Sequence, residues 1–385
     1  MRSDAAPPTS VSLTSYLEPV SARFDPAGTH LIGVLRGEGV GPEVVAVALD
    51  LLAILSRHSS RRIELREGGE IGVPAKAAVG RCLSAEVSAF AAEIFGEGGV
   101  LFCGPGGDRF VYELREEFDL YCKFTPIQPW AELRQAGSIK PEILDDVDIL
   151  AVRDNMEGIY QGQWESATDA SGHAVARHRF HYSAPVVTKL MTIAFRAAAL
   201  RRKRLHVILK PGGVPSISAL WRSCYQSLAG QFGEVEVVEQ EIDNAVYQLV
   251  TYPRQFDVII SPNLFGDVMA DCASALLASR GLSYSGNFNA RGHAAYQTGH
   301  GAARDIAGLN LANPTGQILS LAMMLRESFA WPQAAEKLVA AVRAVLAGGT
   351  CTSDVMMPGC RLTGTAEFGK AVADQLAASL DGERI

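Results

Sequence analysis

The segment FDVIISPNLFGDVMADCASAL, residues 256–276, carries the pattern that best defines the fold. Its first six residues are mostly apolar or β-branched, which indicates a buried strand, and Pro262 and Asn263 then favour the start of a helix. A strand followed directly by a helix is the building unit of α/β proteins. Within the predicted helix Asp267 and Asp271 stand four residues apart, so both carboxylates project from one face.

Two like charges at this spacing repel each other, and two interpretations account for them. One is a solvated helix face, although the residues around the two acids are apolar and leave little polar surface. The other is a divalent cation held between the carboxylates, which removes the repulsion and suits oxygen ligands. The spacing alone leaves both interpretations open.

The same alternation of strand and helix patterns runs along most of the chain. Short β-rich runs occur at LIGVL, GVLFCG, DILAV, LHVILK and VEVVEQ, which are residues 31–35, 99–104, 148–152, 205–210 and 235–240. Helical patterns stand between several of them, such as PEVVAVALDLLAILSRH after the first run. This order predicts an α/β fold with a largely parallel sheet, in which ligands bind near the strand ends.

The composition is that of an ordinary globular protein. The 385 residues are 48% hydrophobic and 20% charged with a net charge of -7, and no block of like charge is longer than the basic run at 201–204. No apolar run is long enough to span a membrane, and the N-terminal segment lacks the apolar core of a signal peptide. We therefore expect a cytoplasmic protein with no nucleic-acid or membrane partner and a mobile polar extension over residues 1–29.

Two glycine-rich segments invite a nucleotide-binding interpretation. The first, GEGVGPE at 37–43, lacks the G-x-G-x-x-G spacing, so a ligand-free turn with a helix start at Pro42 is favoured. The second, GHGAARDIAG at 299–308, combines small residues with a histidine and an acid. A nucleotide could bind there, because small residues let the backbone approach a ligand and an acid can bind ribose hydroxyls, but an ordinary surface loop fits equally well.

Taken together, several segments resemble the isocitrate and isopropylmalate dehydrogenase family, the metal-dependent β-decarboxylating dehydrogenases. GEGVGPEV is similar to the family's first glycine loop, LREEFDLY to its substrate-arginine helix, and VRDNMEGIYQG to its VRExxxGxYxG motif. HYSAPVVTKLMTIAF carries its tyrosine, the segment quoted first is similar to its metal segment, and TGHGAARDIAGLNLANPTGQ to its cofactor loop. The resemblance covers about residues 30–375.

The resemblance implies a two-domain, isocitrate/isopropylmalate dehydrogenase-like α/β fold that is not a standard Rossmann fold. Both chain ends, residues 30–121 and 279–385, would form a large cofactor-binding domain. A small central domain, residues 122–278, would carry the dimer contact and the metal and substrate site. We therefore expect a homodimer whose active sites use residues of both subunits.

The resemblance also implies which residues carry the chemistry. Asp267 and Asp271 would bind Mg²⁺ or Mn²⁺ together with the partner subunit's Asp243. Lys210 would act as the base on the substrate hydroxyl, with a lowered pKa, and Tyr182 as the acid after decarboxylation. The other implied residues are Arg115 and Arg153 for the substrate carboxylate and Gly299, His300, Gly301, Asp305, Ile306 and Asn313 for the cofactor.

The identity of the cofactor follows from one position in the second glycine segment. Asp305 matches the acid that NAD-using members place near the adenosine ribose, where it would repel a 2'-phosphate. NADP-using members tend to carry a Lys-Tyr pair where this chain has Asp305 and Ile306. We therefore expect NAD.

Some departures from the family pattern bear on the substrate. Thr125 stands where a second substrate arginine is expected, and Lys123, two residues earlier, would share its face in an extended segment. Arg109 lies in the loop where family members contact the group on C3, so we expect it to bind a polar or anionic C3 substituent and isopropylmalate to be a poor substrate. Val111 supports the opposite interpretation, an apolar isopropyl pocket.

Two further departures keep a second function open. Gly212 stands where an asparagine usually follows the base lysine, and Glu38 replaces an aspartate in the first glycine loop. The expected activity is NAD- and metal-dependent oxidative decarboxylation of a C3-substituted malate. The alternative is a catalytically weakened relative that binds nucleotide or a partner protein and regulates, against which the retained Tyr182, Lys210 and aspartates argue.

Overall fold

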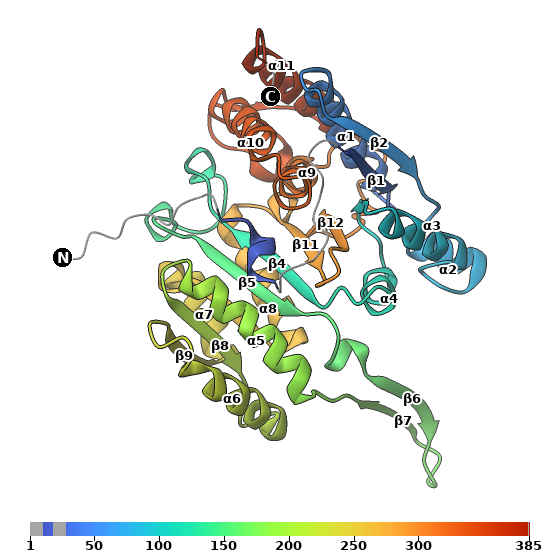
Figure 1. Cartoon of the computed structure of the whole chain (residues 1–385), viewed down its shortest axis with the longest axis vertical. Helices are drawn as coiled ribbons and strands as arrows, with labels where there is room; N and C mark the ends of the chain where they lie inside the picture. The colour runs from blue at the N-terminus through green and yellow to red at the C-terminus, as the bar shows by residue number, and fades with distance from the viewer. Residues whose placement is uncertain (1–10, 18–27, 384) are drawn as a thin grey trace, which may run out of the picture.

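A ten-stranded mixed sheet organises the chain in the computed structural model, which describes residues 11–17, 28–383 and 385 (Figure 1). The strand order is β2-β1-β3-β12-β11-β4-β5-β10-β8-β9. The bounds are β1 Thr29–Leu35, β2 Arg62–Glu67, β3 Val100–Cys103, β4 Cys122–Ile127, β5 Ile149–Asp154, β8 Arg204–Leu209, β9 Glu236–Glu241, β10 Val258–Ser261, β11 Tyr284–Phe288 and β12 Ala294–Thr298. Two small sheets pair β6 Gln163–Thr168 with β7 Ala174–Arg179 and β13 Thr350–Cys351 with β14 Arg361–Leu362.

The large sheet consists of two parallel halves that meet at a pair of antiparallel strands. β2, β1, β3 and β12 pair in parallel, and so do β5, β10, β8 and β9. Between them β11 and β4 are antiparallel to each other and to their outer neighbours. The two halves therefore run in opposite directions, which differs from the continuous parallel sheet of a standard Rossmann fold. The predicted α/β class and the departure from the Rossmann fold are both confirmed.

Helices cover both faces of this sheet. Successive residues of β1 point to opposite faces of the sheet and so pack into two different cores. Ile32 and Val34 pack into the core that includes α1 and α9, whereas Leu31 and Leu35 pack into the core beneath α3. The helices are α1 Gly41–Arg57, α2 Val73–Val79, α3 Ala85–Gly96, α4 Phe110–Glu117, α5 Ala184–Ala199, α6 Pro215–Ala229, α7 Ile242–Thr251, α8 Asn263–Ala273, α9 Thr315–Glu327, α10 Pro332–Ala347 and α11 Thr365–Ser379. In the described part of the chain, no helix has the length and apolar character needed to cross a membrane.

Two helix starts behave as the sequence predicts. α1 begins at Gly41 with Pro42 in its first turn, and α8 begins at Asn263 directly after β10 and Pro262. Proline suits the first helical turn because the amide it lacks would have no partner there. The α8 start places the two aspartates of the opening segment on adjacent turns.

The N-terminal segment differs from the expected mobile extension. Residues 11–17 include the 3₁₀ helix η1, Leu13–Tyr16, and both Tyr16 and Leu17 are buried. The Tyr16 ring meets Phe124 of β4 edge-on at 6.1 Å, and Ser12 Oγ donates to Glu327 of α9 at 2.5 Å. The expectation is wrong for residues 11–17, because their apolar side chains gain burial against the sheet. The rest of the expected extension up to residue 27 lies outside the described residues.

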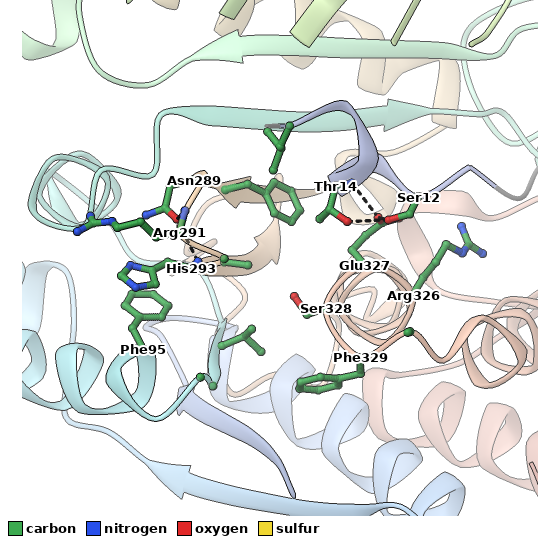
Figure 2. Close-up of a pocket in the computed structure, with 18 residues that line it drawn as sticks. Ser12, Thr14, Phe95, Asn289, Arg291, His293, Arg326, Glu327, Ser328 and Phe329 are labelled. Atoms are coloured by element: carbon green, nitrogen blue, oxygen red, sulfur yellow. Dashed lines mark hydrogen bonds between the residues drawn. The ribbon is translucent and has the colours of Figure 1, made fainter. Parts of the chain in front are cut away.

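A cavity of about 390 Å³ lies between this segment and the body of the protein, and we call it the N-terminal cavity. Figure 2 shows Glu327 on one side with its hydrogen bonds to Ser12 and Thr14, and His293 beside Phe95 on the other. Its remaining walls come from Leu17, the α3–β3 turn, the β11–β12 turn with its flanking strand residues, and the end of α9 with the loop that follows. These residues are Gly98, Gly99, Val100, Phe288, Asn289, Arg291, Gly292, Ala294, Arg326, Ser328, Phe329 and Ala330.

Candidate active site

A second cavity, of about 200 Å³, lies over the middle of the large sheet, and we call it the charged cavity. Strand ends and strand faces both contribute to it, since Gly106 follows β3 while Lys123 and Thr125 lie on one face of β4. It is lined by Gly106, Val111, Tyr112, Arg115, Lys123, Thr125, Arg153, Asp267, Ala270, Asp271, Arg280, Ser283, Ser285, Gln297, Thr298, Gly299, His300 and Gly301. Several residues predicted from segments far apart in the sequence therefore meet in one place.

Three buried cations form one wall of the charged cavity. Arg115 projects from α4 and its Nε donates to Asn287 Oδ1 at 3.1 Å, while Arg153 and Lys123 stand opposite each other on paired strands β5 and β4. Burial, followed by the charge of Arg153, lowers the pKa of Arg115 to about 9. Like cations are costly to bury together unless anions balance them, so this wall is suited to bind a multiply charged anion.

The face of β4 brings Lys123 to the position where the expected second arginine is absent. Lys123 and Thr125 are two residues apart on an extended strand, and both line the charged cavity, as predicted. Burial, then Arg153 and Arg115, lower the pKa of Lys123 to about 7. Its charge is therefore sensitive to pH in the neutral range, unlike that of an arginine.

The two aspartates of α8 face these cations. Asp267 pairs with Arg153 and accepts a hydrogen bond from the Tyr160 hydroxyl at 2.9 Å. Burial acts to raise the pKa of Asp267, but Arg153, Lys123 and the tyrosine lower it further, so the net shift is downward. Asp271 accepts a bond from Arg280 at 3.0 Å, and burial raises its pKa. Asp267 is thus held as a carboxylate.

The aspartates suit a hard divalent cation. Mg²⁺ is usually bound by one or two carboxylates together with water and substrate oxygens, and adjacent turns of α8 supply two carboxylates on the cavity wall. Among the described residues, no group of three or more His, Cys, Asp or Glu side chains is placed to hold a metal. A third protein ligand would therefore have to come from outside this set.

Lys210 and Asp243, the expected base and third metal ligand, lie away from the charged cavity. Lys210 is partly exposed at the end of β8, and its Nζ donates to Glu241 at 2.6 Å and to Asp243 at 2.9 Å. These two hydrogen bonds raise the pKa of Lys210, which is the opposite of the lowering expected for a base. Neither Lys210 nor Asp243 lines the cavity within one chain.

Tyr160, which our sequence analysis did not predict as a site residue, is better placed than Tyr182 to act beside the aspartates of α8. Its hydroxyl contacts Asp267, and its ring lies 5.5 Å from the guanidinium carbon of Arg153. Tyr182 is buried beside Trp221 and its hydroxyl oxygen accepts the Asn263 N–H at 2.8 Å. The signal was present in the sequence, because Tyr160 is the tyrosine of the VRDNMEGIYQG motif.

The loop expected to contact C3 presents Val111 rather than Arg109. The Arg109 guanidinium lies 4.6 Å from the centre of the Trp164 ring and donates to the Tyr160 carbonyl oxygen at 3.2 Å. It is absent from the lining of the charged cavity, whereas Val111 and Tyr112 are present. The geometry favours an apolar wall at this point.

The two glycine segments form one unit at the rim of the cavity. Val40 N donates to the Ala302 carbonyl oxygen at 2.9 Å, and a Cβ on Gly39, whose φ is +60°, would overlap that oxygen. Glu38 is buried, accepts from Gly107 N and pairs with Arg304 at 2.8 Å. The first segment is thus a turn that supports the second loop.

The predicted cofactor residues differ in their surroundings. His300 and the two flanking glycines line the charged cavity, a Cβ on Gly301 would meet open space, and His300 Nε2 is a buried atom without a hydrogen-bond partner among the described residues. Asp305 is exposed, whereas Ile306 packs near Val40 and Val44. Asn313 is buried, and its Oδ1 accepts the Thr315 N–H at the start of α9. The histidine and open glycine can accommodate a polar ligand group, while Asn313 fixes the helix start.

A cavity in which acids and cations converge beside a glycine loop, on an α/β sheet, is suited to an enzyme that binds a small anionic ligand. Residues 31–372 match the family described as isocitrate/isopropylmalate dehydrogenase. The chain belongs to this family and is an oxidoreductase.

Individual relatives agree with the family match. The 3-isopropylmalate dehydrogenase of Synechococcus sp. (strain JA-3-3Ab) is 35% identical over 363 residues, which cover 91% of this chain and 94% of the relative. That of Synechococcus sp. (strain CC9605) is 36% identical over 361 residues, covering 90% and 99%. The crystal structure of isocitrate dehydrogenase from Methylococcus capsulatus is similar with a TM-score of 0.80 at 26% identity, covering 90% of this chain and 99% of that chain.

Proposed function

We propose that this protein is an NAD- and Mg²⁺- or Mn²⁺-dependent enzyme that oxidatively decarboxylates a C3-substituted malate. The observation that carries the proposal is the charged cavity, which combines two carboxylates suited to a hard cation with three cations suited to substrate carboxylates. The loop at 299–301 borders the same cavity. Family membership supports the reaction class.

The residues on the cavity walls have separable tasks. Arg115, Lys123 and Arg153 bind and orient the substrate carboxylates. Asp267 and Asp271 are the residues that would hold the metal. A bound divalent cation supplies polarisation of the substrate hydroxyl, and bound NAD supplies a hydride acceptor.

Tyr160 is our candidate for the acid that protonates carbon after carbon dioxide leaves. Burial, followed by the charge of Asp267, raises the pKa of Tyr160, so its hydroxyl keeps its proton at neutral pH. The hydroxyl lies beside a metal-binding carboxylate, where the reacting carbon has to be held. The role expected for Tyr182 passes to Tyr160 in this proposal.

We infer that a second copy of the chain completes the site. Lys210 and Asp243 are close to each other but outside the charged cavity, so a partner subunit has to supply them as base and third metal ligand. The β6–β7 hairpin projects from the body of the molecule with both faces largely exposed (Figure 1). Tyr247 of α7 and Val268 of α8 are exposed apolar residues on adjacent helices and supply further surface for a homodimer.

The proposed substrate carries an apolar group on C3, because Val111 and Tyr112 line the cavity while Arg109 does not. The test is NADH production from isopropylmalate, isocitrate, tartrate and unsubstituted malate, each with Mn²⁺ and with a chelator. We expect isopropylmalate to give the highest kcat/KM, and Arg109→Ala to leave that value within about threefold. Isocitrate or tartrate as the best substrate, with a large loss in the Arg109 variant, would restore the polar C3 hypothesis, and no NADH from any acid would refute the activity.

NAD is proposed over NADP. Asp305 is exposed within the cofactor loop, where a carboxylate can accept ribose hydroxyl hydrogen bonds and would repel a 2'-phosphate. Steady-state KM values for the two cofactors test this assignment. A lower KM for NADP than for NAD in the wild-type protein would overturn it.

A further inference from the structure

Arg280 is a fourth cation at the charged cavity, and our sequence analysis predicted no role for it. Its Nη2 donates to Asp271 Oδ1 at 3.0 Å and to the Gly299 carbonyl oxygen at 3.4 Å. It therefore bridges the helix that carries the aspartates and the first residue of the cofactor loop. The side chains of this ion pair are 55% and 51% exposed.

The backbone that carries Arg280 is held firmly. It begins the 3₁₀ helix η7, Arg280–Leu282, whose N-cap Ser279 accepts from Gly281 N at 2.9 Å and donates to Asp354. A Cβ on Gly281 would lie 2.8 Å from Asp354 Oδ2 and 2.9 Å from Asn313 Cβ, so η7 is packed closely against its neighbours. Only the outer part of the arginine side chain can change its partner without moving this backbone.

The two arginine–aspartate pairs of the cavity differ in their exposure to solvent. Arg153 is only 5% exposed where it pairs with Asp267, so water cannot readily replace that contact. The Arg280–Asp271 pair is open to solvent, and exposed ion pairs contribute little stability. Asp271 is therefore the carboxylate whose present counter-ion is the easier to displace.

We propose that Arg280 is an exchangeable counter-ion, which neutralises Asp271 in the empty cavity and turns to the substrate carboxylate when a divalent cation binds the aspartates. The inference rests on the proposed function, which requires a metal at Asp267 and Asp271 and an anionic substrate. A divalent cation needs the Asp271 oxygen that Arg280 occupies, so metal binding releases the guanidinium inside an anion-binding cavity. Metal and substrate then bind cooperatively, because each ligand favours the same position of Arg280.

The first test is Mn²⁺ binding to the full-length protein without substrate, measured by titration calorimetry. Arg280→Leu and Arg280→Gln remove the competing charge and should bind Mn²⁺ about two- to fivefold more tightly than wild type, the range that an exposed ion pair can account for. Arg280→Lys should stay close to wild type. Arg343→Leu is the matched control, because it removes an arginine paired with Glu132 at 2.9 Å on α10, away from the cavity.

The second test repeats the titration with saturating 3-isopropylmalate. Wild type and the Arg343 control should gain more Mn²⁺ affinity from the acid than Arg280→Gln does. Unchanged or weaker Mn²⁺ binding in the Leu and Gln variants without acid, or an equal gain in wild type and Arg280→Gln, would overturn the exchange. A failure of every protein, including wild type, to bind Mn²⁺ would instead refute the metal site of the proposed function, and the exchange with it.

Discussion

The two faces of strand β4 support two different kinds of structure. Lys123 and Thr125 point into the charged cavity, whereas Phe124, between them, packs against Tyr16 on the opposite face. On the first face, Lys123 lines a cavity together with other cations and two carboxylates, where a charged ligand can bind. On the second, the N-terminal segment is fixed by apolar burial and by hydrogen bonds to one carboxyl group, Glu327.

This difference predicts how each face responds to substitution. In the charged cavity, like charges lie close together, which costs stability, and we propose that they bind the ligand. Their replacement should therefore lower activity more than stability. Groups around the N-terminal cavity contact no proposed reactant, so their replacement should lower stability more than activity (Figure 2). The following substitutions test that contrast.

Asp267→Asn should have the largest effect. The variant loses the charge that faces Arg153 and the proposed metal, and we expect kcat/KM to fall by about 10³-fold or more while the fold persists. NADH production with excess Mn²⁺ and a thermal unfolding curve measure the two quantities. Wild-type turnover by this variant in the presence of a chelator would show that the metal assignment is mistaken.

Tyr160→Phe and Tyr182→Phe separate a reacting tyrosine from a structural one. Tyr160→Phe should lower kcat by about 10²-fold, because it removes the proposed acid, with little change in stability. Tyr182→Phe removes the acceptor of the buried Asn263 N–H and should cost about 1–3 kcal/mol of stability with a small change in kcat. The reverse pattern would return the catalytic role to Tyr182.

Tyr16→Ala tests the opposite face. The substitution removes a buried ring that packs on Phe124 and should lower the free energy of unfolding by about 2–3 kcal/mol. Denaturant unfolding measures the loss, and kcat/KM at a temperature where the variant is folded should stay within about twofold. A large loss of activity in the folded variant would contradict the separation of the two faces.

Lys123 should make substrate binding depend on pH. With a pKa near 7 it is charged below this pH and neutral above it, so KM should rise by up to about tenfold per pH unit above neutrality. Lys123→Met should have a higher KM that does not change from pH 6 to 8.5.

The lowered pKa of Lys123 also affects stability. The folded protein binds fewer protons than the unfolded chain between pH 7 and about 10.4, so the free energy of unfolding should rise with pH across this window.

Glu327→Gln should have the smallest effect. Burial raises the pKa of Glu327 in the folded protein above its ordinary value. Between the two pKa values the folded protein binds more protons than the unfolded chain, so the stability that Glu327 contributes falls as pH rises through this window. The glutamine retains an acceptor for Ser12 and does not titrate, so we expect a change within about 1 kcal/mol and the loss of this pH dependence. Unfolding measured at pH 5 and pH 8 for both proteins tests it. A variant that follows the wild-type pH profile would show that Glu327 is not the group responsible.

Much of the architecture was predictable from the sequence because it depends on local backbone geometry. The strand period of two predicted that Lys123 and Thr125 share a face, and the helical period predicted that Asp267 and Asp271 do. The strand–turn–helix start at Pro262 is equally local. Each of these features depends only on residues close together in the sequence, so the sequence pattern is enough to predict it.

Other features depend on how distant segments pack, which no local pattern encodes. Our sequence analysis assigned the acid to Tyr182 and not to Tyr160, because only the packing of the 3₁₀ helix η4, Ile159–Gln161, against α8 brings the Tyr160 hydroxyl to Asp267, while the Tyr182 hydroxyl is buried against a backbone amide. It did not reveal Arg280 beside Asp271, nor the docking of residues 11–17 on the sheet. The tertiary structure decided these positions, since the strand order and the antiparallel junction at β11 and β4 determine which side chains meet across the two halves.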